Sequence, residues 1–381
     1  MRDVEGYFNS QAAACADETV SDLWRQLQDF HARRLWHQLT GVLQELVKHL
    51  KGVHALLPLY TQAIAEFENK LNPLTLVEIC RPIAASLSES GEVTEADEFL
   101  DKLGVKVRHN TESFALTKIL QGQIYVERQK NMDKTKMVLN EVEQLLDEIV
   151  GIGIVQKEFY LLQSEYFKIL GNHAEYYKAS LRYLGVSHLN ERSDEENISL
   201  ASHLALAAIL GKNVFNFGEL LAHPILKYLA QAPEQWLIEL LQAFNAGHVA
   251  KFTALKQHWG KQPDLLANEP ILYEKISLLS LMEMTFTRSA THRQITFQEI
   301  ADQTNLSHDK IELLVMKALS RGLIKGQIDQ VGETIHIHWV QPRVLDCSQL
   351  QTLQGKIDKW LEAIASVEGL IETNAKEILT Y

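Results

Sequence analysis

Cysteine is scarce in this chain of 381 residues, and its three copies lie far apart in the sequence. Cys15, Cys80 and Cys347 form no CxxC pair. An odd, sparse set of cysteines favours a reducing compartment. It argues against both a disulfide framework and a zinc cluster.

Long hydrophobic runs are also missing. The most apolar stretches, such as LALAAIL at 204–210, are too short to span a bilayer. The opening residues, MRDVEGYFNSQAAACADE, contain no apolar segment of the kind that a signal peptide needs. We therefore expect a protein that works inside the cell, in water, without a membrane partner.

Positive charge is in deficit, because the formal net charge is −12. A negative surface repels phosphate, so a nucleic-acid role would need a local basic patch. The nucleotide and hydrolase motifs GxxxxGK(S/T), GxGxxG and GxSxG are absent from the sequence. No group of residues points to catalysis, and we expect neither enzyme activity nor a cofactor.

Helical periodicity is what the sequence does have. From about residue 20 to 286, apolar residues recur with a period close to 3.6, and Gly, Asn and Pro interrupt the pattern. Short breaks, such as LGNH at 170–173, predict antiparallel helix pairs. The stretch 158–185 resembles a tetratricopeptide unit. The expected fold is therefore mainly α, an α-solenoid of helical hairpins, with a compact helical bundle as the alternative.

The pattern changes after residue 290 and predicts a winged helix. Thr296 and Glu299 have the spacing of a capping box that opens a helix. Ser307 is placed to cap a second helix over 308–320, and Gly322 to close it. A β-like run at 295–297 precedes these helices, and two more strands follow in LIKGQID and TIHIHWV, joined across QVGE.

The second helix of this module lacks the residues that read DNA. Its outward face carries two acids together with Leu313 and Met316, where a DNA reader would place Arg, Lys, Asn or Gln. Over 291–341 there are five Lys or Arg residues against six Asp or Glu. An exposed Leu–Met pair favours a protein partner. The alternative is that both residues pack on the preceding helical part.

The HIHW segment is a candidate metal site at most. His336 and His338 share one face of a strand, but a catalytic zinc ion needs a third protein ligand and an open position. We interpret them as two histidines on a solvent-facing or partner-facing wing strand. We therefore predict no metal ion.

The last residues carry a heptad seam. Apolar residues spaced three and four apart recur over about four heptads, with one polar interruption, and predict a long helix that seeks other helices in a bundle. The alternative is docking back on the solenoid. The seam residues are Leu350, Leu353, Ile357, Trp360, Ile364, Val367, Ile371, Asn374 and Ile378.

Helical repeats that lead into a winged helix resemble the PCI module of the proteasome lid, the COP9 signalosome and a translation initiation factor complex. Longer strings sharpen this resemblance to the family of 26S proteasome non-ATPase regulatory subunit 13, over nearly the whole chain. It is weakest in the first 25 residues, at 85–110 and at 186–199. The strings include VFNFGELLAHPIL (214–226), LLQAFNAGHVAKFTALKQHWGKQPDLLANE (240–269), IELLVMKALSRGLIKGQID (311–329) and WVQPRVLD (339–346).

The resemblance implies a non-catalytic scaffold in the cytoplasm and nucleus, within a hetero-oligomer. Its implied partners are other PCI subunits of the lid, the lid deubiquitinase heterodimer and a nearby ubiquitin receptor. The implied domains are a solenoid (1–170), the helical part of a PCI domain (171–290), its winged helix (291–341) and a C-terminal bundle helix (346–381). Another PCI complex, a nucleic-acid binder and a metalloenzyme remain as alternatives.

Overall fold

The structure, a computed structural model, describes residues 4–14, 17–50, 52–149, 151, 153–288, 293–345 and 347–379. The chain forms two compact units, Met1–His188 (unit 1) and Leu189–Tyr381 (unit 2). Within the described residues, no helix combines the length and the apolar character that crossing a membrane would require.

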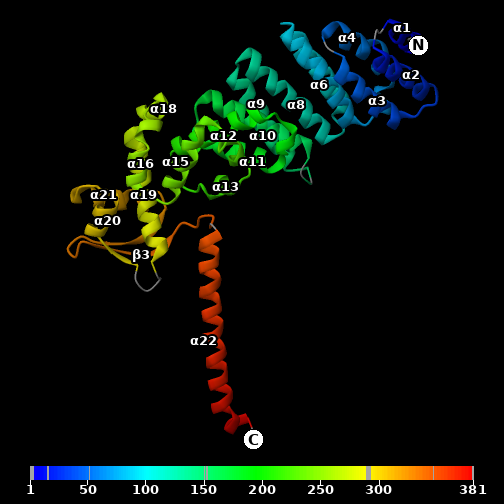
Figure 1. The fold of residues 1–381 in the computed structure, drawn as a ribbon. Helices are drawn as coiled ribbons and strands as arrows, with labels where there is room; N and C mark the ends of the chain where they lie inside the picture. Colours follow the sequence, from blue (N-terminus) through cyan, green and yellow to red (C-terminus); the bar gives the residue numbers. More distant parts are fainter. Residues whose placement is uncertain are drawn as a thin grey trace. The chain divides into compact units, whose positions relative to one another are not determined.

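Unit 1 is helical throughout its described part (Figure 1). Its α-helices are α1 (Val4–Ala14), α2 (Glu18–Ala32), α3 (Trp36–His49), α4 (Val53–Pro58), α5 (Ala65–Phe67), α6 (Pro73–Glu89), α7 (Val93–Val107), α8 (Thr111–Ile124), α9 (Met132–Leu146), α10 (Ile154–Leu170) and α11 (His173–Val186). Two short π-helices, η1 (Leu59–Ile64) and η3 (Tyr125–Gln129), and one 3-10 helix, η2 (Glu68–Lys70), lie between them.

Successive helices of unit 1 pack against one another. Helix α7 contacts α6 and α8, α8 contacts α9, and α10 contacts α11. Helix α8 also contacts α6 and α10, so each hairpin lies against the next one. This stacking of helical pairs confirms the predicted α-solenoid.

Asparagine side chains begin several of these helices. Asn172 opens α11, and its side-chain oxygen accepts a hydrogen bond from the Glu175 amide at 3.4 Å. The preceding Gly171 has φ +71°, a left-handed conformation that glycine adopts without strain and that ends α10. The same capping occurs at Asn72, Asn110 and Asn131.

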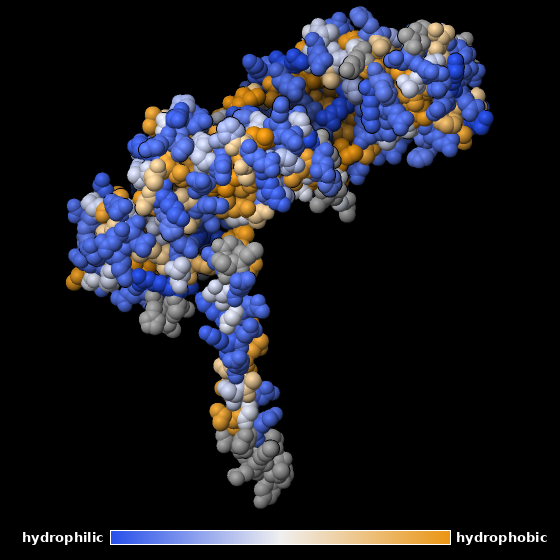
Figure 2. All heavy atoms as spheres, viewed as in Figure 1, coloured by the Kyte–Doolittle hydropathy of each residue, from blue (hydrophilic) through white to orange (hydrophobic). Residues whose placement is uncertain are grey.

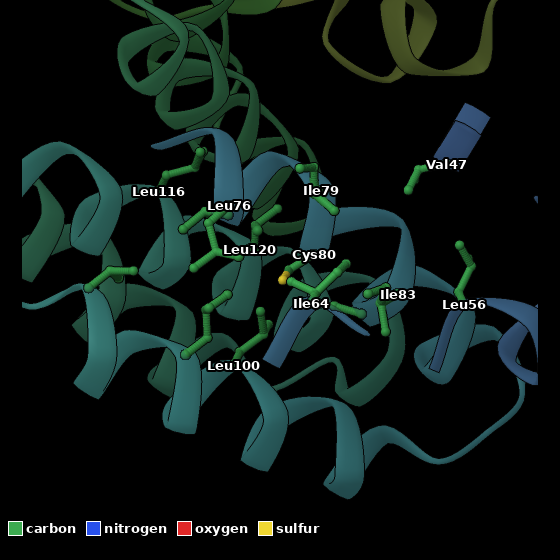
Figure 3. Packing of buried hydrophobic residues seen from close by; sticks show 14 of the residues in the cluster. Val47, Leu56, Ile64, Leu76, Ile79, Cys80, Ile83, Leu100, Leu116 and Leu120 are labelled. Atoms are coloured by element: carbon green, nitrogen blue, oxygen red, sulfur yellow. The ribbon is translucent and has the colours of Figure 1, made fainter. Parts of the chain in front are cut away.

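The core of unit 1 is apolar and closely packed (Figure 3). Cys80 of α6 is fully buried beside Ile64 and Ile83, which makes this thiol a core residue. Helices α8 and α10 approach closely at Gly122, where a Cβ atom would lie 2.6 Å from a methyl carbon of Leu162. A larger residue at 122 would push these two helices apart.

Unit 2 begins with a helical part. Its helices are η4 (Leu189–Glu191), α12 (Asp194–Leu210), α13 (Gly218–Ala222), α14 (Leu226–Leu229), η5 (Pro233–Gln235), α15 (Trp236–Asn245), α16 (Val249–Ala254), α17 (Lys256–Trp259), α18 (Pro263–Ala267) and α19 (Glu269–Thr287). Phe252 and Trp259 stack in its core with ring centroids 4.9 Å apart.

A buried lysine ties α19 to the end of α12. The Lys275 ammonium donates hydrogen bonds to the carbonyl oxygens of Ala208, Ile209 and Gly211 at 2.7–2.9 Å. The Ala208 and Ile209 carbonyls belong to the last turn of α12, where carbonyls lack a partner within the helix, and the ammonium satisfies them at the negative end of the helix dipole. Burial still lowers the pKa of Lys275 well below its ordinary value.

The winged helix has the predicted order. Strand β1 (Gln294–Thr296) leads into α20 (Phe297–Thr304), α21 (His308–Ser320), β2 (Ile324–Asp329) and β3 (Thr334–Val340). The Thr296–Glu299 capping box is confirmed, and Gly322, at φ +68°, follows the end of α21. Ser307 is the N-cap of α21, but its side chain makes no capping hydrogen bond, so that part of the prediction is wrong.

The three strands form one antiparallel sheet in the order β1–β3–β2. Ile295 pairs with Ile335, and Ile335 also pairs with Ile328. Ile335 and Ile337 are buried toward the helices, so the alternate residues of β3 face outward.

Helix α22 (Cys347–Leu379) is the last element and is 33 residues long. At 1.5 Å per residue it spans about 50 Å. Figure 1 shows it as one uninterrupted helix.

Candidate protein-interaction surfaces

The first candidate surface is the outward face of α21. Leu313 and Met316 are each 52% exposed. Ile311, Leu314 and Val315, from the same helix, are buried as the helical spacing predicts. Leu313 and Met316 are therefore not buried beneath the helical part of unit 2.

A groove of about 320 Å³ runs beside Leu313, between α19 and α21. Pro270 and Tyr273 of α19 form one wall, and Lys310 and Leu313 of α21 form the other. Together with the exposed Met316, it gives this side of unit 2 an apolar surface with a charged rim, the usual composition of a protein-binding patch.

Two cations at the C-terminal end of α21 are paired within unit 2. Lys317 and Arg321 both pair with the Glu274 carboxylate of α19, at 2.8 and 2.7 Å. Glu312 lies on the same helix and accepts a hydrogen bond from Gln330 of the wing turn at 3.2 Å. A helix with Lys317 and Arg321 bound to a carboxylate, and with acids on its outer face, is poorly suited to phosphate and base edges.

The wing places His336 and His338 on the exposed face of β3. The His338 carbonyl oxygen accepts a hydrogen bond from the Arg293 guanidinium at 3.3 Å. In the part of the chain that the structure describes, no cluster of three or more His, Cys, Asp or Glu residues could hold a metal ion. Because β3 is the central strand, residues 335–340 offer a partner mainly their side chains, and β1 and β2 form the edges.

The second candidate surface is the seam of α22. The described seam side chains are between 43% and 67% exposed, so the chain itself does not cover them. They are Leu350, Leu353, Ile357, Trp360, Ile364, Val367 and Ile371. Asn374 and Ile378 lie outside the residues whose side chains the structure describes. Figure 2 shows hydrophobic residues along the described part of this helix.

Two further apolar residues widen the seam. Leu361 and Leu370 are 57% and 62% exposed, and both lie next to seam positions on the helix surface. The strict spacing of three and four residues missed them, whereas a plot of all apolar residues around the helix would have found them. An apolar face wider than a two-helix seam is typical of helices that contact several neighbours.

The polar positions of α22 differ in charge on the two sides of the seam. At 100° per residue, Asp358 and Glu372 lie on one side, and Lys356 and Lys359 lie on the other. Charges that flank an apolar seam set which partner helix binds and in which direction.

The buried carboxylates of unit 1 form a separate, internal feature. Glu158 of α10 binds the Arg81 guanidinium through both oxygens, at 2.7 and 2.9 Å. Burial, together with the charges of Glu127 and Glu158, raises the pKa of Glu165 to about 7. Carboxylates gathered beside a structural ion pair, without a nucleophile among them, indicate packing constraints more than catalysis.

Two known protein families together match residues 23–339 of the chain. The family described as PSD13 N-terminal repeats matches residues 23–241, and the PCI domain family matches residues 242–339. The second match ends at Trp339, before α22 begins.

Individual relatives agree with these matches. The 26S proteasome non-ATPase regulatory subunit 13 of Dictyostelium discoideum is 35% identical, over 94% of this chain and 95% of its own. Its homolog A from Arabidopsis thaliana is 34% identical, with the same shares of the two chains covered. Similarity to the eukaryotic translation initiation factor 3 subunit M of Phaeosphaeria nodorum is weaker, at 23% identity over 65% of this chain.

Proposed function

This chain belongs to the family of 26S proteasome non-ATPase regulatory subunit 13, and on that premise we propose that it is a non-catalytic structural subunit of the proteasome lid. It supports assembly of the lid and, through the lid, the degradation of ubiquitinated proteins. It works in the cytoplasm and nucleus.

The uncovered apolar face of α22 carries this proposal. Monomeric proteins rarely expose a continuous apolar patch larger than a few hundred Å². A helix of about 50 Å with such a face along its described length is instead typical of a subunit that completes its core with other chains. The partners of this seam are helices of other lid subunits, including the deubiquitinase heterodimer.

The winged helix supplies a second contact. Leu313 and Met316, the adjacent groove, and the outward histidines of β3 bind a neighbouring PCI subunit side by side. A ubiquitin receptor lies nearby in the assembly. The pairing of Lys317 and Arg321 with Glu274 supports a protein partner over a nucleic acid at this surface.

Other PCI complexes are the nearest alternative. The extent of similarity favours the proteasome, because the proteasome relatives match 94% of the chain at 34–35% identity, whereas the initiation factor subunit matches 65% at 23%.

Native-gel separation of cell extract tests the proposal. Tagged full-length chain should migrate with the 26S proteasome, and mass spectrometry of that band should identify lid subunits. A chain that ends at Asp346 should migrate in smaller species. Migration of the full chain alone, or with the subunits of another complex, would reject the assignment.

Substitutions on two faces of α22 separate a seam contact from a general effect of charge. Ile357→Asp or Ile364→Asp places a carboxylate in the apolar interface and should strongly reduce incorporation into the lid. Ser366→Asp adds the same charge on the opposite face of the helix and should leave incorporation unchanged. Normal incorporation of either seam variant would reject the bundle contact.

A further inference from the structure

Residues 341–345 connect the wing to α22, and they contact both the winged helix and the helical part of unit 2. The Gln341 amide donates to the Leu323 carbonyl oxygen at 2.8 Å. The Arg343 guanidinium donates to the Asn245 carbonyl oxygen, at the end of α15, at 3.0 Å, and it also binds the Glu283 carboxylate of α19. The Arg343 side chain is 8% exposed, so this contact is largely shielded from water.

The next residue is seated against α13. A Cβ atom added to Gly218 would lie 2.5 Å from the Cβ of Val344 and 3.0 Å from its carbonyl oxygen. The Asn216 side-chain oxygen accepts hydrogen bonds from the amides of both Gly218 and Val344, at 3.2 and 3.4 Å. Glycine at 218 is therefore what lets the connecting strand approach so closely.

Residues 341–345 form what we call the strap. Its contacts add little net stability to the fold, which favours a role in positioning the chain. Val344 remains 39% exposed, so seating it buries little apolar surface. A buried ion pair such as Arg343–Glu283 adds little net stability, because desolvation offsets its attraction. What the contacts do achieve is to hold the chain within three residues of Cys347, where α22 begins.

We propose that the strap is a clamp that positions α22 relative to the winged helix, with Arg343 as its positioning residue. The inference rests on the proposed function, in which the α21 surface and the α22 seam bind the same assembly. Two contacts on one chain reinforce each other through the effective concentration that their linker sets.

Linker length gives the size of the expected effect. With the strap seated, two residues separate Val344 from the start of α22, and with the strap released, six residues separate Val340 from it. If effective concentration falls with the −3/2 power of linker length, release lowers the affinity of the full chain roughly fivefold.

Gly218→Ala is the variant that releases the strap. The added methyl group occupies the place of Val344, while the backbone of Gly218 is outside the left-handed region, so α13 itself accepts alanine. Glu283→Gln is a second variant, which removes the charge that binds Arg343 and adds no bulk. Gly185→Ala is the matched control, because a Cβ atom at 185 meets nothing within 4 Å.

The first measurement is limited digestion of the free full-length chain by trypsin, which cleaves after arginine and lysine. Cleavage after Arg343 should be faster in Gly218→Ala and Glu283→Gln than in wild type and in Gly185→Ala. Circular dichroism melting should show the same unfolding temperature for all four. Equal cleavage rates in folded variants would overturn the clamp.

The second measurement is the affinity for purified lid that lacks this subunit. Both strap variants should bind roughly fivefold more weakly than wild type. In a chain that also carries Ile357→Asp, the seam no longer contributes, and the strap variants should have no further effect. If the Arg343 contact only stabilised the fold, the strap variants would lower the affinity for the lid equally with and without Ile357→Asp.

The two proposals fail in different ways. If wild-type chain does not bind the depleted lid, the proposed function and the positioning role are both overturned, whatever trypsin reports. If wild type binds, and the strap variants are cleaved faster yet bind equally well, the positioning role alone is overturned.

Discussion

Helices α10 and α22 carry similar amphipathic patterns, but the apolar stripe of α10 is buried and that of α22 is exposed. In α10, Val155, Phe159 and Leu162 are buried against neighbouring helices of unit 1. In α22, the described residues of the seam are 43% to 67% exposed. The difference lies in the neighbours: α8, α9 and α11 pack against α10 and cover its apolar stripe, whereas the described seam residues of α22 stay largely exposed. The same pattern therefore builds a core in one region and an interface in the other.

Replacing one apolar side chain by alanine in each helix should test the difference between α10 and α22 most clearly. Leu162→Ala should lower the free energy of unfolding of unit 1 by about 4 kcal/mol, because it leaves a cavity at the contact of α8 and α10. Ile364→Ala should change the stability of the free chain by less than about 0.5 kcal/mol, since that side chain is already in water. Urea unfolding followed by circular dichroism measures both. Equal losses in the two variants would contradict the distinction.

Charged contacts should show the same contrast between buried and exposed sites. Arg81→Ala leaves the buried Glu158 carboxylate without its cation and should destabilise unit 1 by about 2–3 kcal/mol. Arg25→Ala removes an arginine from an exposed pair with Asp22 and should cost less than about 0.5 kcal/mol. Urea unfolding of both variants at neutral pH makes the test. A small effect at Arg81 would mean that water replaces the ion pair.

Glu165 should make the stability of unit 1 depend on pH. Burial, followed by the charges of Glu127 and Glu158, raises its pKa from 4.5 to about 7. A carboxyl group that holds its proton more tightly in the folded state costs stability as the pH rises from 4.5 to 7. The unfolding free energy of Glu165→Gln should therefore equal that of wild type near pH 4 and exceed it by about 3 kcal/mol at pH 8.

Unfolding curves recorded at several pH values measure this difference. Glu143→Gln, on the exposed surface of α9, is the control and should follow the wild-type curve. A constant difference between Glu165→Gln and wild type at all pH values would show that titration of Glu165 is not the cause.

The α21 surface should give the smallest effect. Met316→Glu places a charge in a contact that we propose to be apolar, and it should weaken binding to lid that lacks this subunit about tenfold. Met137→Glu makes the same substitution at an exposed methionine of α9 and should have no effect on binding. The affinities of the two purified variants for this lid test whether Met316 lies in the interface. Equal affinities would remove Met316 from the interface.

Local signals in the sequence account for much of the fold. The apolar spacing of 308–320 predicted α21 with the bounds that the structure has, and the Thr296–Glu299 pair predicted how α20 begins. These features depend on residues within one or two turns of each other, which a pattern along the chain can reveal. The seam of α22 was predicted for the same reason.

The sequence missed features that depend on distant residues. Nothing in the sequence pattern marks Lys275, and only its contact with the end of α12 explains its burial. The strap joins Val344 to Gly218 across the fold, and no periodicity links those positions. Leu361 and Leu370 were missed for a simpler reason, because they lie beside the strict heptad positions.

The sequence by itself determined the helical character of the chain, the winged helix and the presence of a long apolar seam, because periodicity is a local property of the residues. Only the tertiary structure decided which apolar faces are covered and which segments distant in sequence contact each other. Covering a face requires contacts between segments far apart in sequence, and the described seam residues of α22 remain 43% to 67% exposed. That is why one helical pattern became the core of unit 1 and another remained open to partners.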